Sequence, residues 1–197
     1  MKRVAYILGA TLVAAAAMAG IAVALDSPPG DPEVVELLGG MNYVPDQSRI
    51  DAVLGATAVD QLIAIAEDDS QGSDPGLRMR AFRALSQYGG SPDEVLASAA
   101  LRRALTTFAA NDEGTELLFL RASMLSLATV DGPSAVPELV GLLQHPSRDI
   151  RAACAQALGI TESDAAILPL RNQDLVETVP QVKLAIASAL FQLDSNN

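Results

Sequence analysis

The chain has 197 residues, half of them hydrophobic, with no tryptophan, one cysteine and one histidine. Structural zinc needs about four Cys or His ligands and a Cys–His nucleophile needs both residues close in space, so most metal and thiol chemistry is excluded. The net charge of −11 repels phosphate backbones, so nucleic acid is not an expected partner.

The first 24 residues have the character of an export signal. Lys2 and Arg3 precede an apolar run over residues 4–25, and Ala22-Val23-Ala24 provides a cleavage site after Ala24. The run is also long enough to cross a bilayer, so an uncleaved membrane anchor is the alternative. We therefore expect the rest of the chain to be periplasmic or secreted after cleavage, or else held outside the inner membrane by a single N-terminal anchor.

Residues 25–56 are expected to form a tether followed by capping helices. The proline-rich stretch from Asp26 to Pro32 predicts the tether. Two short helices are predicted next, over residues 32–38 and 48–54, where they would cover the open end of a helical stack.

Residues 57–197 contain a helix signature that recurs four times. Each copy has an aliphatic residue, a cation and a run rich in Ala and Leu, at Leu77-Arg78, Leu120-Arg121, Ile150-Arg151 and Val182-Lys183. The residue before each cation and those three, six and seven positions after it are apolar or small, and they share one helical face. Because each face needs cover from a neighbouring helix, the recurrence predicts a stack of helix pairs.

A first helix is expected before each signature. Residues 58–65 and 135–142 have the same apolar spacing and predict the first helices of pairs one and three, with Thr57 as the N-cap of the earlier helix. Ser91-Pro92-Asp93-Glu94 predicts the start of the first helix of pair two, with Ser91 as N-cap. That helix is expected to extend to about Ala109.

The fourth pair has weaker signals. Ile167 and Leu170 predict a short first helix, and Pro180 lies near the start of the second. No segment shows the two-residue alternation of a strand, so an all-α fold is predicted.

The third pair carries the most specific motif in the chain. Pro137 lies in its first helix, Asp149 and Arg151 open its second, and an Ala-rich run follows to Gly159. In this it resembles the HEAT and HEAT-like (phycobilisome-lyase type) repeat family, and the likeness extends over roughly residues 57–193. The resemblance implies a short right-handed α-solenoid of about four helix pairs with an N-terminal capping segment.

The resemblance also implies roles for the charged residues of the signature. In the family, the acidic residue and the arginine link adjacent repeats, which Asp149 and Arg151 would do here. The recurring cations Arg78, Arg121 and Lys183 are expected to hold inter-repeat geometry in the same way, because half-buried cations need partners.

Residues that suggest chemistry have simpler structural interpretations. Cys154 occupies a buried offset of the signature and is expected in the core, and His145 belongs to a turn. The acidic loop over residues 67–74 departs from the EF-hand spacing and is expected to be a solvated loop rather than a calcium site. Arg102 and Arg103 diverge on a helix and are expected to be solvated. No catalytic residue, metal or cofactor is therefore predicted.

The remaining candidate for a functional surface is formed by the side chains one, five and nine positions after each cation. We call this surface the ridge. Its predicted partner-binding residues are Met79, Arg83, Gln87, Ser126, Gln156, Ser188 and Gln192, and Ala122, Ala152 and Leu184 complete it. Small, amide-bearing and hydroxyl-bearing side chains suit a protein or peptide partner.

These observations predict a non-enzymatic, exported HEAT-repeat scaffold. A membrane-anchored assembly factor is the alternative if residues 4–25 remain attached. The resemblance also implies a third account, a lyase or modification accessory protein.

Overall fold

The computed structural model describes residues 32–40 and 43–195, so the predicted export segment and its cleavage site lie outside the described residues. The described residues form helices and short 3-10 turns, with no strand among them, so the all-α prediction is confirmed. The α-helices are α1 (Pro32–Leu37), α2 (Gln47–Leu54), α3 (Ala58–Glu67), α4 (Pro75–Ala84), α5 (Glu94–Phe108), α6 (Glu116–Asp131), α7 (Val136–Val140), α8 (Arg148–Ile160), α9 (Ile167–Val176) and α10 (Pro180–Ser195). The 3-10 turns are η1 (Gly55–Thr57), η2 (Leu85–Tyr88), η3 (Gly132–Ala135), η4 (Gly141–Gln144) and η5 (Asp164–Ala166).

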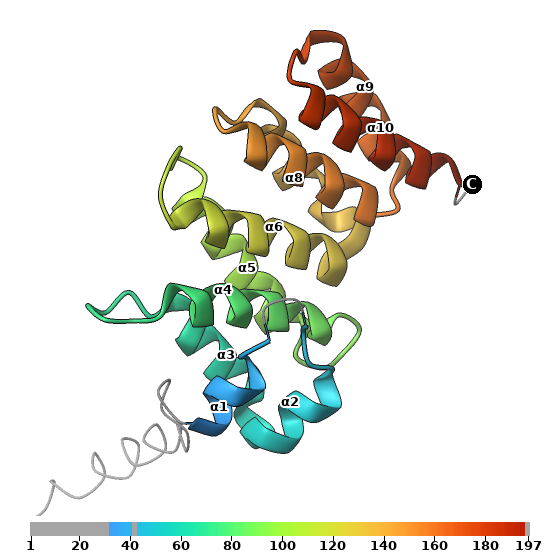
Figure 1. Cartoon of the computed structure of the whole chain (residues 1–197). Helices are drawn as coiled ribbons and strands as arrows, with labels where there is room; N and C mark the ends of the chain where they lie inside the picture. The colour runs from blue at the N-terminus through green and yellow to red at the C-terminus, as the bar shows by residue number, and fades with distance from the viewer. Residues whose placement is uncertain (1–31, 41–42, 196–197) are drawn as a thin grey trace, which may run out of the picture.

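Within the described part of the chain, four helix pairs follow one another: α3–α4, α5–α6, α7–α8 and α9–α10. Figure 1 shows the second helices α4, α6, α8 and α10 side by side in one layer, with α3 and α5 behind them. Helix α6 contacts both α4 and α8, and α8 also contacts α10. Each helix of the layer thus covers its neighbours, as the predicted solenoid requires.

The signature faces form the core. Leu120, Ile150 and Val182, which precede three of the cations, are at most 1% exposed. The residues three and six positions after each cation are buried in all four copies. Of the face positions, Leu190 alone is only partly buried, because it lies on α10, the last helix that the structure describes. Burial of these apolar side chains stabilises the stack by about 25 cal/mol for each Å² removed from water.

The N-terminal helices cap the first pair. Val34 of α1 and Ile50 of α2 are fully buried against the same core. Tyr88 Oη donates a hydrogen bond of 2.7 Å to Asp51 Oδ1, which links the end of the first pair to α2. Burial and this hydrogen bond raise the pKa of the Tyr88 hydroxyl.

Two predicted N-caps differ in detail from the structure. Thr57 precedes α3, but its hydroxyl accepts from Gln61 Nε2 at 2.9 Å and makes no capping bond to a backbone N–H. Helix α5 begins at Glu94, three residues after Ser91. The Ser91 hydroxyl donates to the Tyr88 carbonyl at 2.7 Å and accepts from the Asp93 backbone N–H at 3.2 Å, so it caps the turn that leads into α5 rather than the first residues of α5 itself.

Three of the four phenylalanines meet at the junction of the first two pairs. The ring centroids of Phe82, Phe108 and Phe119 are 5.4 to 6.3 Å apart, in edge-on or tilted arrangements. Arg78 lies over the Phe119 ring at 4.5 Å, and its Nε donates to the Ala66 carbonyl at 3.1 Å. Arg78 therefore contacts both its own pair and the next one.

Candidate functional site

A cavity of about 520 Å³ opens on the ridge side of α4 and α6. We call it the groove. Its walls are mainly apolar and come from α4, η2 and α6, with one residue from the segment before α2 and one from the end of α8. The lining residues are Val44, Met79, Arg83, Ser86, Leu118, Arg121, Ala122, Leu125, Ser126, Thr129 and Ile160.

The groove brings together three of the seven predicted partner-binding residues. Met79 and Arg83 lie one turn apart on α4 and are half-buried, and Ser126 faces them from α6. Ser126 is only 3% exposed, which differs from the expectation that ridge side chains point into solvent. The reason is that α6 lies between α4 and α8, whose side chains cover much of it.

The other four predicted residues do not line the groove. Gln156 is exposed on α8, and Ser188 and Gln192 are exposed on α10, farther along the same layer. Gln87 lies in η2, where its amide donates to the Ser86 hydroxyl at 3.4 Å. The ridge is thus one groove followed by an open polar surface.

The apolar walls of the groove were not among the predicted site residues, and Arg121 does not have the role predicted for it. Arg121 is exposed, and among the described residues it makes no hydrogen bond or ion pair, so it does not hold inter-repeat geometry. The sequence does indicate that Arg121 lacks an ion-pair partner on its own helix. The residues three and four positions away on both sides, including Leu118 and Leu125, are apolar.

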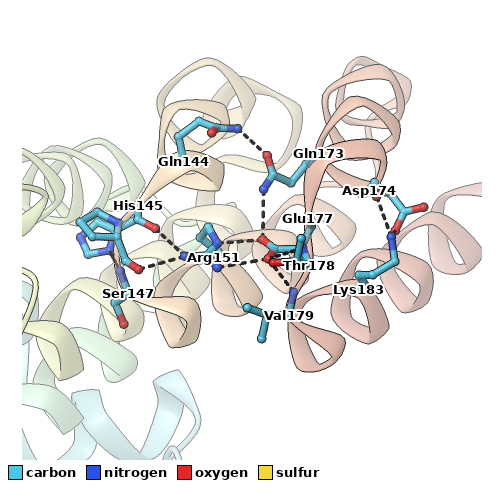
Figure 2. A network of polar contacts seen from close by, with 11 residues as sticks. Gln144, His145, Ser147, Arg151, Gln173, Asp174, Glu177, Thr178, Val179 and Lys183 are labelled. Carbon is cyan, nitrogen blue, oxygen red and sulfur yellow. Dashed lines mark hydrogen bonds and ion pairs between the residues drawn. The ribbon is translucent and has the colours of Figure 1, made fainter.

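Arg151 links the third pair to the fourth. Figure 2 shows its guanidinium between two pairs, with Nε donating to Glu177 Oε2 at 2.8 Å and Nη2 donating to Oε1 at 3.2 Å. Nη1 donates to the carbonyls of His145 and Pro146, each at 2.9 Å. The arginine beside it, with the Val179 and Thr178 backbone N–H groups and the Gln173 amide, lowers the pKa of the Glu177 carboxyl to about 2.

Both charged residues of the motif contact the fourth pair. The ion-pair partner of Arg151 is Glu177, from the loop between α9 and α10. Asp149 accepts from Gln181 Nε2 of α10 at 3.2 Å. Lys183 pairs with Asp174 at 3.0 Å within the fourth pair, so it is not an inter-repeat residue.

The adjacent arginines of α5 are not simply solvated, as they were expected to be. Arg102 Nε pairs with Glu138 of α7 at 2.8 Å, and its Nη1 pairs with Asp131 at the end of α6. Arg103 pairs with Glu67 of α3 at 2.8 Å. Their divergence on the helix is what directs one toward the preceding pair and the other toward the following pair.

Cys154 and His145 are both buried. Cys154 is fully buried, its thiol donates to the Leu139 carbonyl at 3.0 Å, and burial raises its pKa. His145 lies in the predicted turn, but it is only 5% exposed, and its Nδ1 accepts from the Ser147 backbone N–H at 3.0 Å. The two residues therefore have structural contacts.

The acidic loop caps a helix. Asp74 precedes α4 and accepts from the Gly76 backbone N–H at 2.8 Å, and Asp68 accepts from the Ser70 N–H at 3.0 Å. Within residues 32–40 and 43–195, no three or more His, Cys, Asp or Glu side chains are grouped so as to hold a metal ion. None of the described helices combines the length and apolar character needed to cross a membrane.

Comparison with known proteins agrees with this geometry. A family model described as HEAT repeats matches residues 118–190, which extend from α6 into α10. No curated protein matches the chain.

Proposed function

Since a family model of HEAT repeats matches residues 118–190, we propose that this protein is a non-enzymatic scaffold that binds a protein or peptide through its ridge, with the groove as the main contact. HEAT repeats commonly serve as protein-interaction scaffolds, and stacked repeats present a continuous layer of helices to a partner. The fold alone names no activity, so the proposal depends on the groove.

The groove is the observation that carries the proposal. It combines apolar walls with Met79 and two arginines, and methionine and arginine are enriched in protein–protein contacts. Leu118 and Ile160 on its edge are 47% and 40% exposed, so a partner would remove apolar surface from water there.

The same proposal places the protein outside the cytoplasm. The basic start, the apolar run and the cleavage motif over residues 1–24 support export, and the stretch from Asp26 to Pro32 supplies a tether. If residues 4–25 remain attached, the scaffold acts as a membrane-anchored assembly factor. The intact mass of the protein isolated from the cell envelope separates the two, since cleavage removes residues 1–24.

Site-specific photo-cross-linking tests the binding surface. A photoreactive amino acid at Leu125, inside the groove, should cross-link one discrete partner in native envelopes, and the same group at Arg171 on α9 should not. The bulky substitution Ala122→Trp should abolish the Leu125 cross-link by filling the groove. Because Ala122 is 4% exposed, this variant is used only after its circular dichroism spectrum and melting temperature have been shown to match those of the natural protein. Equal cross-linking from both positions, or a partner unaffected by Ala122→Trp, would contradict the proposal.

A further inference from the structure

We propose that the groove recognises a segment that combines one or two carboxylates with an adjacent aliphatic side chain. This inference rests on the proposed function and specifies the chemistry of the partner. The carboxylate would pair with Arg121, Arg83 would add positive charge to the same groove, and the aliphatic side chain would lie against Leu118 and Leu125.

The charge of the groove is opposite to that of the chain. Asp and Glu outnumber Lys and Arg by 24 to 13 over the whole sequence. Of the eleven described residues that line the groove, however, the two that carry charge are both arginines, Arg83 and Arg121. The groove is therefore a local positive site on an acidic protein, and it favours a negatively charged group.

Arg121 is available for this role. Other arginines of the first three pairs have partners inside the chain: Arg78 contacts Ala66 and Phe119, Arg102 contacts Asp131 and Glu138, Arg103 contacts Glu67, and Arg151 contacts Glu177. Arg121 has no such contact among the described residues, and it lies at the wall of a cavity. A guanidinium is suited to hold a carboxylate through two parallel hydrogen bonds.

The apolar walls limit how acidic the partner segment is. Leu118, Leu125 and Ile160 border the arginines and offer no hydrogen-bonding side chain, so they suit an aliphatic group beside the carboxylate. A long polyacidic run would meet two arginines and then the repulsion of an acidic surface. One or two carboxylates flanked by aliphatic residues fit both constraints.

Selection from a phage-displayed library of short random peptides on the immobilised full chain tests this chemistry. The selected peptides should be enriched in Asp or Glu next to Leu, Ile or Met, and depleted in Lys and Arg. Selected peptides that are basic or uncharged, yet are no longer selected by the Ala122→Trp variant, would overturn this inference while leaving the proposed function intact. Failure to select any peptide, or selection unchanged by Ala122→Trp, would count against both.

A direct affinity measurement completes the test. A synthetic selected peptide and its counterpart with Gln and Asn in place of Glu and Asp are compared by fluorescence anisotropy. We expect the neutral counterpart, and separately Arg121→Glu, to weaken binding by about tenfold or more. Arg171→Glu makes the same charge change at an exposed position outside the groove and should leave affinity within about twofold. Equal binding by the neutral peptide, or unchanged binding by Arg121→Glu, would refute the role of the carboxylate.

Discussion

The guanidinium of Arg151 and the carboxylate of Glu177 join two consecutive helix pairs through two parallel hydrogen bonds, of 2.8 and 3.2 Å. The Glu177 side chain is 4% exposed and the Arg151 side chain 15%, so both charges are largely removed from water. Each is compensated mainly by the other, and removal of one leaves a buried charge without its partner.

Arg151→Ala should lower the free energy of unfolding by about 2 kcal/mol, because Glu177 would then remain buried without its cation. Urea unfolding followed by circular dichroism measures this. Arg148→Ala provides a matched control, since the Arg148 side chain is 67% exposed and 3.9 Å from its nearest carboxylate. The control should change stability by less than about 0.5 kcal/mol. Equal losses in the two variants would show that the Arg151–Glu177 pair is not the cause.

The Arg151–Glu177 pair should make the free energy of unfolding depend on pH. The pKa of Glu177 is lowered in the folded protein from its ordinary value of 4.5 to about 2. A lowered folded-state pKa contributes stability above the ordinary value and loses it as pH falls toward the folded value. The stability difference between the natural protein and Glu177→Gln should therefore be largest above pH 4.5 and shrink steadily toward pH 2. Unfolding curves over this range would contradict the prediction if the difference stayed constant.

The adjacent arginines of α5 should differ in their effect on stability. Arg102 pairs with Asp131, whose side chain is 7% exposed, whereas Arg103 and Glu67 are 55% and 41% exposed. Arg102→Ala is expected to cost about 2–3 kcal/mol and Arg103→Ala less than about 1 kcal/mol, since exposed ion pairs contribute little. Thermal and urea unfolding of the two single variants would test the order, and a larger loss from Arg103→Ala would overturn it.

Gly159 is expected to tolerate no side chain. A Cβ at this position of α8 would lie 3.1 Å from both Cα and Cβ of Ala189 on α10 and 2.6 Å from Gln192 Oε1. Gly159→Val should therefore force α8 and α10 apart and lower stability by about 1–3 kcal/mol. Gly141→Ala is the control, because a Cβ at Gly141 meets no atom within 4 Å. Gly141→Ala should be neutral or slightly stabilising. Thermal unfolding of the two variants measures both effects.

The Cys154 thiol should react only when the protein opens. It is fully buried within α8, and its raised pKa reduces the thiolate that attacks disulfide reagents. We expect no labelling by an aromatic disulfide reagent in buffer and complete labelling in denaturant. Labelling at the rate of a free thiol in buffer would show that the α7–α8 core is open.

Helix periodicity was enough to predict much of the fold. Met124, Cys154 and Ile186 were placed on one face by their distance from a cation, and all three are fully buried. The weak fourth pair was also found, with Pro180 at the start of α10. Periods of this kind are local, because each residue's position on a helix depends only on its neighbours in the chain.

Tertiary structure decided which charges meet. Arg151 lies 26 residues from Glu177 and Arg102 lies 36 residues from Glu138, and no short-range pattern relates them. Direct ion pairing acts over a few ångströms. Whether a cation forms an ion pair with a distant carboxylate therefore depends on how neighbouring helices dock and on the course of the loops. The sequence by itself therefore determined helices and their buried faces, whereas the docking of the helices placed Arg121 at the wall of the groove, where it has no partner among the described residues.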